Sequence, residues 1–360
     1  MKKILFLLVI FIIISINVFA TPDFSEVNDS LNGVVNESPE EIIEAILENK
    51  MNFDGKNIIE KIFSLFIASV KNVLPHILSL FTVSVIISVV EKLKLINNRC
   101  ENAVMIGGKI IFTVILISSS SVFISNSKEC LEKISGFTDA LMPIIITLLA
   151  SIGAKGTVTI LGPSQVLLSS VLINICVNVI FPLIIIGFVT VTINGILPDN
   201  KLKGIADLMK NFSTWCMGGV FMIYSAIIAI QGAVSGVTDG ISVKSIKYAL
   251  SSSVPIIGSS ISDSFSSVLL SALSIKSAAG IMGIIIILTI TIAPIINIWA
   301  YISILNVFSA CVHPFAGDFV CSQIKNMTQF LKLSATVLLG VSVLWFIYLG
   351  VIILAGGNLI

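Results

Sequence analysis

Long apolar runs without charged residues recur along this chain and constrain its fold more than any other feature. The longest, residues 165–197, extends over 33 positions. A run of about 18 apolar residues or more can cross the hydrocarbon core of a bilayer as a helix. Only 11% of the residues are charged and the mean hydropathy is +1.07, whereas an ordinary soluble domain has about 25% charged residues. The chain is therefore predicted to be an all-α, polytopic membrane protein. This excludes a soluble enzyme, a disordered chain and a basic nucleic-acid-binding domain.

About six to seven membrane spans are expected, with polar loops between them. The apolar stretches are residues 73–90, 104–125, 141–161, 165–197, 212–232, 281–305 and 333–354, and the predicted loops are residues 91–101, 126–139 and 198–211. Residues 141–161 contain Pro143 and Gly153, so this stretch either spans the membrane or enters it and returns. Lysine and arginine concentrate in cytoplasmic loops. The lysine-containing loops at 91–101 and 198–211 both lie inside only if 141–161 is re-entrant. We therefore expect six spans with re-entrant or interfacial amphipathic helices, and a kink at Pro182.

The N-terminal region is predicted to be exported. Residues 1–20 are typical of a secretory signal peptide, with Lys2 and Lys3 ahead of an apolar segment and Ala20 before the cleavage position. The alternative is an uncleaved membrane anchor. Residues 21–61 contain ten acidic residues and three lysines, a net charge of −7, which argues against nucleic-acid binding. An amphipathic helix is predicted to begin at Ser38-Pro39; it either docks on a partner or on the membrane, or packs on its own chain. Residues 62–360 are expected to form the membrane domain.

Residues 231–280 differ from the other apolar regions because they are rich in Ser, Gly and Ala and contain scattered charges. Two amphipathic helices are predicted here, joined by a break at residues 254–258. Such helices are too polar to face lipid, so they either line a water-filled cavity or contact another subunit. The alternative is a pair of interfacial helices with solvated charges. The candidate polar groups are Gln231, Asp239, Lys244, Lys247, Tyr248, Asp263 and Lys276, and the candidate backbone-shaping residues are Gly232, Gly240, Pro255, Gly258 and Gly280.

The same segment carries a resemblance to a known family. Residues 231–248 read Q-G-A-V-S-G-V-T-D-G-I-S-V-K-S-I-K-Y, and the match continues through V-P-I-I-G, S-D-S and S-A-L-S-I-K-S-A-A-G up to residue 280. This order resembles the signature region of the stage III sporulation protein AE family. The resemblance implies a permease-like subunit of a secretion-type channel complex between mother cell and forespore, required for forespore development. It also implies placement in the mother-cell (outer forespore) membrane. The implied partners are the other stage III sporulation A proteins, among them an ATPase and ring-forming proteins, and stage II sporulation protein Q.

Enzymatic function is not expected. The chain has neither H-E-x-x-H nor a phosphate-binding loop of the G-x-x-x-x-G-K-[ST] type. It has only two histidines, and its six cysteines form no C-x-x-C pair, so no cofactor or metal is predicted. The alternative function is a stand-alone secondary transporter, whose central site would use proline-broken helices. A channel subunit should depend on partners, whereas a transporter should move solute by itself.

Overall fold

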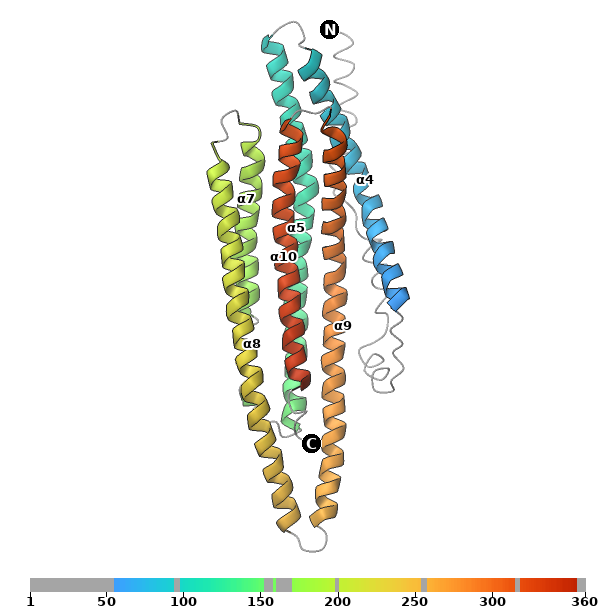
Figure 1. The fold of residues 1–360 in the computed structure, drawn as a ribbon, viewed down its shortest axis with the longest axis vertical. Helices are drawn as coiled ribbons and strands as arrows, with labels where there is room; N and C mark the ends of the chain where they lie inside the picture. Colours follow the sequence, from blue (N-terminus) through green and yellow to red (C-terminus); the bar gives the residue numbers. More distant parts are fainter. Residues whose placement is uncertain are drawn as a thin grey trace.

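The computed structural model describes residues 55–93, 98–151, 158–159, 170–197, 201–253, 258–314 and 318–354. They form an elongated bundle of long helices (Figure 1). The elements are α4 (Gly55–Leu93), α5 (Asn98–Ser151), the π-helical turn η1 (Cys176–Ile180), α7 (Phe181–Asn194), α8 (Lys203–Ser253), α9 (Gly258–Val312) and α10 (Asp318–Leu354). The expected signal peptide, the acidic segment up to residue 54 with its amphipathic helix, and Pro255 lie outside the described residues.

Six helices in the described part of the chain are long and apolar enough to cross a membrane. They are Ile62–Val89, Met105–Thr147, Ser170–Asn194, Lys203–Val234, Ser277–Val312 and Asp318–Leu354. This confirms the polytopic all-α prediction. Successive helices alternate in direction, so the C-terminal ends of α4, α7 and α9 and the N-terminal ends of α5, α8 and α10 lie at one end of the bundle (Figure 1). The C-terminal end of α8 and the N-terminal end of α9 lie at the opposite end, where the two helices extend beyond the rest.

Helices α8 and α10 run parallel to each other, as two helices separated by one helix do in an alternating bundle. Three contacts establish the register: Lys210 Nζ donates to Gln329 Oε1 at 2.7 Å, Phe221 covers Gly340, and Val351 covers Gly232. In every pair the two residues are 119 positions apart. Successive pairs are 11 residues apart, close to three helical turns, which keeps the contacting residues on one face of each helix.

The structure overturns the sequence-based prediction of a loop at residues 126–139, because this stretch belongs to the continuous helix α5. Of residues 141–161, expected either to span the membrane or to enter it and return, residues 141–151 also belong to α5, whereas residues 152–157 and 160–161 lie outside the described residues. The charged residues of the stretch 126–139 occupy one face, where Lys128 pairs with Glu132 and Lys133 pairs with Glu129. The opposite face is buried and apolar at Leu131. A helix with one charged face accommodates the charges that had suggested a loop. Likewise, α8 begins at Lys203, inside the predicted loop 198–211.

The irregularity expected at Pro182 is a π-helical turn. Helix η1 ends at Ile180, and Pro182 occupies the first turn of α7. Proline has no N–H and its ring clashes with the carbonyl of the residue four positions earlier in an α-helix. That carbonyl belongs to Asn178, inside η1, so the wider π-helical turn falls where the proline disrupts the regular ladder. Turns of this kind are frequent at functional sites.

A buried hydroxyl cluster connects α5 to α9. Tyr301 Oη lies 2.7 Å from Ser119 Oγ and 3.1 Å from Ser120 Oγ, and its ring stacks on Phe123 at 4.4 Å. Ser119 Oγ also donates to the Ile115 carbonyl at 2.9 Å. Because a serine hydroxyl has one proton, the Tyr301 hydroxyl is the donor to Ser119. The serine run 118–121 therefore bonds both its own backbone and a neighbouring helix, as a polar group within a membrane must.

Tyr301→Phe is expected to destabilise the bundle by about 0.6–1.7 kcal/mol, from the average to the largest value measured for hydrogen bonds between membrane helices. The substitution removes the hydroxyl and retains the stacked ring. Tyr348→Phe is the matched control, because the Tyr348 hydroxyl is buried with no hydrogen-bond partner among the described residues. The free energy of unfolding, measured by detergent titration in mixed micelles, should fall only for Tyr301→Phe. Equal values for the two variants would contradict this assignment.

Candidate functional site

The uncharged segments of α8, α9 and α10 lie side by side, and each is long enough to cross the hydrocarbon core of a bilayer. Residues 211–238, 277–312 and 333–354 contain no Asp, Glu, Lys or Arg. Phe221 and Gly340 bring α8 next to α10, and Gly280 lies against Ile353. The outward side of α8 exposes Trp215 and Met222, as a lipid-facing helix does. We call these three segments the apolar belt.

The part of helix α5 that lies beside the apolar belt contains charged residues. Phe123 stacks on Tyr301, the Cys130 thiol lies 3.4 Å from the Ile290 carbonyl oxygen, and a Cβ at Gly283 would lie 2.7 Å from Leu141. Residues 123–141 of α5 are therefore level with residues 283–301 of α9, inside the apolar belt. Five charged residues lie in that part of α5, namely Lys128, Glu129, Glu132, Lys133 and Asp139.

The charged residues belong to a polar face of α5 that other helices of the described chain leave uncovered. Nearer its N-terminus α5 exposes apolar side chains, among them Ile106 and Ile110. Between residues 121 and 139 its exposed residues are Ser121, Ser125, Glu129, Glu132, Lys133, Gly136 and Asp139, with Lys128 half-buried beside them. We call these eight residues the α5 polar face. A charged residue at the centre of a membrane helix costs about 2.5–3.5 kcal/mol on insertion scales. Lipid is thus a poor environment for this face, which requires water or protein.

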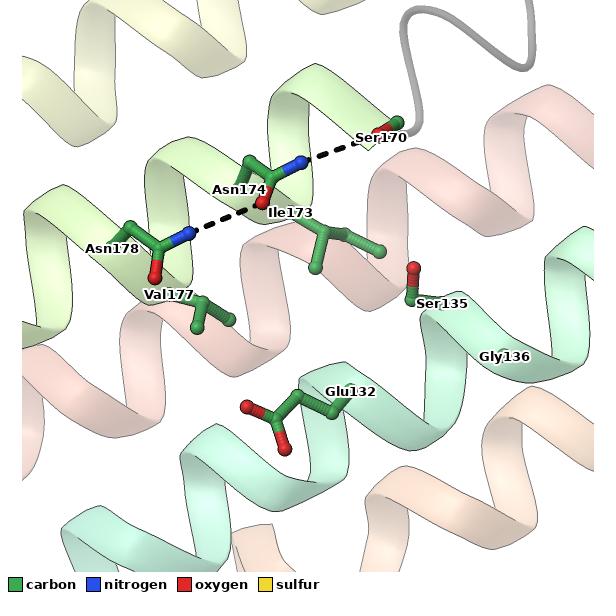
Figure 2. A pocket seen from close by; sticks show the side chains of 8 residues that line it. All are labelled: Glu132, Ser135, Gly136, Ser170, Ile173, Asn174, Val177 and Asn178. Atoms are coloured by element: carbon green, nitrogen blue, oxygen red, sulfur yellow. Dashed lines mark hydrogen bonds between the residues drawn. The ribbon is translucent and has the colours of Figure 1, made fainter.

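A groove lies between the α5 polar face and the helix that leads into η1. Its α5 wall consists of Glu132, Ser135 and Gly136, and its other wall consists of Ser170, Ile173, Asn174, Val177 and Asn178, around a cavity of about 390 Å³ (Figure 2). Asn178 Nδ2 donates to Asn174 Oδ1 at 3.1 Å, and Asn174 Nδ2 donates to Ser170 Oγ at 3.2 Å. These bonds form a polar ladder along the groove, opposite Glu132. Ile173 and Val177 make part of this wall apolar, and the groups that can hydrogen-bond to water are the amides, hydroxyls and carboxylate of the other lining residues.

The residues predicted from sequence lie elsewhere, on and beside the α8–α9 hairpin. Asp239, Gly240, Lys244, Lys247 and Tyr248 belong to the C-terminal part of α8, and Gly258, Asp263 and Lys276 belong to the N-terminal part of α9. These residues follow the span Lys203–Val234 or precede the span Ser277–Val312. The charged side chains and Tyr248 are outside the described part of the structure.

Three of the predicted residues are described in full and lie inside the bundle. Gln231 is buried, Gly232 contacts Val351, and Gly280 contacts Ile353. The two glycines sit where neighbouring helices approach closely.

Sequence reasoning missed the α5 polar face and the ladder in the groove. Their signal was present as opposite charges four residues apart and as Ser170, Asn174 and Asn178 at helical spacing. No group of three His, Cys, Asp or Glu within the described residues is arranged to hold a metal ion.

The bundle and its polar face define a polytopic helical membrane protein with ionisable groups level with its uncharged segments. Comparison with known proteins then places it within one family. The family model for stage III sporulation protein AE matches residues 38–356, and the chain belongs to that family. Stage III sporulation protein AE of Bacillus subtilis (strain 168) is 25% identical over 269 residues, which cover 73% of this chain and 67% of the relative. No solved structure matches the chain. Membership of the family gives the protein a role in sporulation.

Proposed function

We propose that this chain is a permease-like, non-enzymatic subunit of a secretion-type channel that links mother cell and forespore and supports forespore development. The observation that carries the proposal is the α5 polar face, which crosses the apolar belt and is left uncovered by the described chain. Charged residues within membranes mark pathways for ions and solutes. The groove beside this face supplies a wall of such a pathway, with Asn174 and Asn178 on one side and Glu132 on the other.

The position of this face favours a channel subunit over a stand-alone transporter. A secondary transporter holds its site between repeated halves of its own bundle. Among the described residues the polar face lies on the outside of the bundle, and we infer that further chains close the passage. Partner proteins would close the passage, and we assign this role to the other stage III sporulation A proteins. An ATPase among them would supply the energy. Stage II sporulation protein Q would complete the channel from the forespore side.

Loop charge favours one orientation in the mother-cell membrane. Lys92, Arg99, Lys201 and Lys203 lie at or beside the α4–α5 and α7–α8 connections, which share one end of the bundle. The enrichment of lysine and arginine in cytoplasmic loops places that end inside. The α8–α9 hairpin then projects on the outer side, towards the forespore membrane. Residues 235–253 extend α8 by about 28 Å beyond its span at 1.5 Å per residue, a length suited to contact with ring-forming partners between the membranes.

Thiol labelling tests both the passage and the orientation. In a cysteine-free chain expressed in protoplasts with its partners, Asn178→Cys should react with a membrane-impermeant reagent, because thiols react as thiolates, which need water. Val179→Cys is the matched control, because Val179 is exposed one residue further on, where it should face lipid. Ser253→Cys should label from outside, and Lys201→Cys only after permeabilisation.

Two results would overturn parts of this proposal. Equal reactivity of Asn178→Cys and Val179→Cys would show that the groove is not an aqueous path. The reverse pattern for Ser253→Cys and Lys201→Cys would invert the orientation. Solute uptake by vesicles that contain only the purified chain would support the transporter instead.

A further inference from the structure

The four charges nearest the centre of the α5 polar face form two columns of opposite order. Lys128 and Glu132 make the first column, with their charged groups 3.9 Å apart. Glu129 and Lys133 make the second column, at 3.0 Å. Towards the C-terminus the first column therefore runs from positive to negative, and the second runs from negative to positive. All four side chains remain between 44% and 61% exposed, so they can meet a second surface.

Small residues lie between the columns. At 100° per residue, Ser125 and Gly136 fall on the line midway between the two columns, 11 residues and about three turns apart. A Cβ at Gly136 would have no atom within 4 Å. Small residues at such a position allow two membrane helices to approach closely. The face thus combines a narrow centre line with charged flanks, as in parallel helix pairs whose flanking charges select the partner.

We propose that a second copy of this chain covers the α5 polar face, with the two α5 helices parallel and packed along Ser125 and Gly136. In this arrangement Lys128 of one copy meets Glu129 of the other, and Glu132 meets Lys133. The paired residues differ in height by about 1.5 Å, the rise of one residue. The inference rests on the proposed function, since it names the chain that closes the passage on the side of the α5 polar face.

An identical copy fits this face better than an unrelated partner does. Two copies inserted in the same membrane have the same orientation and depth. Their charge columns therefore lie at the same height in the membrane. Like charges that face each other are destabilising and opposite charges are favourable, and the two columns are complementary only to each other at equal depth. An unrelated protein would need four charges of matching order at the same depth.

Exchanging charges within one column provides a sharp test. Glu129→Lys with Lys133→Glu retains the net charge, the composition and the ion pair within the helix, but it places like charges opposite each other between copies. Exchanging all four residues (Lys128→Glu, Glu129→Lys, Glu132→Lys, Lys133→Glu) restores complementarity. The readout is disulfide formation between two copies of a cysteine-free chain that carries Gly136→Cys, measured in native membranes.

The expected yields distinguish the second copy from other occupants of the face. The reference chain and the fourfold exchange should cross-link to a product of twice the chain mass. The yield of this product should be about tenfold lower for the single-column exchange, which corresponds to a loss of about 1.4 kcal/mol in the free energy of association. Tagged copies of the reference and fourfold-exchanged chains should not cross-link to each other. The proposal is overturned if the reference chain gives no dimer, if all variants give equal yields, or if the product contains another protein. Labelling of Asn178→Cys together with any of these results would retain the aqueous groove and reject only the second copy.

Discussion

Replacing Lys128, Glu129, Glu132 and Lys133 together by leucine is expected to abolish sporulation while the chain still inserts into the membrane. Leucine at the centre of a membrane helix is favourable by about 0.3–0.6 kcal/mol, whereas the charged residues are unfavourable by about 2.5–3.5 kcal/mol each. The variant should therefore insert at least as well as the original chain. It would present lipid-compatible side chains where the proposed channel needs polar ones. Heat-resistant spores should fall to the count of a strain that lacks the protein, with unchanged amounts of the chain in the membrane.

The matched control places the same number of leucines on the lipid-facing side of α8. Met222, Ile223, Ile230 and Val234 are exposed apolar residues, and their replacement by leucine should leave spore counts unchanged. Normal sporulation with four leucines on the α5 polar face would remove the basis of the proposed function. A chain that disappears from the membrane would show instead that these charges serve folding.

Gly340→Ala is expected to destabilise the bundle by about 1–3 kcal/mol, the usual penalty for overpacking. Gly340 lies on α10 where the Phe221 ring of α8 approaches, and a Cβ there would overlap that ring. Because α8 and α10 are parallel and in contact over several turns, they cannot separate at this point without losing the neighbouring contacts. The free energy of unfolding in mixed micelles should therefore fall.

A second substitution tests the cause. Phe221→Leu should restore much of the stability of the Gly340→Ala chain, giving a coupling energy that independent sites would not show. Gly350→Ala on the same helix is the matched control, because a Cβ at that position meets no atom within 4 Å. It should be neutral or stabilising by up to about 1 kcal/mol, the difference in helix propensity between alanine and glycine. Equal effects at positions 340 and 350 would contradict the close approach of α8 and α10.

Local sequence patterns predicted α9 and α10 better than α5. The spans at 281–305 and 333–354 lie within α9 and α10, because uncharged apolar runs of that length have few other stable conformations. Of the break expected at residues 254–258, only Gly258 belongs to the described residues, where it begins α9. In α5, the charges at residues 128–139 predict a loop, since charged residues in a span are unfavourable. They form a helix because the opposite face, with Phe123 and Leu131, is buried.

The candidate functional sites show the same difference between what a local sequence pattern predicts and what depends on contacts between helices. Residues 231–280 were identified from a string of residues that resembles a family signature, and the family is confirmed over residues 38–356. The groove could not be found in this way, since Glu132 and Asn178 come from different helices. Nothing near either residue in the sequence indicates that the two face one cavity.

The sequence by itself determined the class of the protein, because the thickness of a bilayer sets how long an uncharged run must be and each run carries that information locally. It also determined the family, through the order of residues in one segment. Only the tertiary structure decided the depth of the α5 charges. Depth is set by contacts of α5 with another helix, such as Phe123 with Tyr301 and Cys130 with Ile290. Those contacts join residues more than 150 positions apart, so the polar face became recognisable only when the helices were packed.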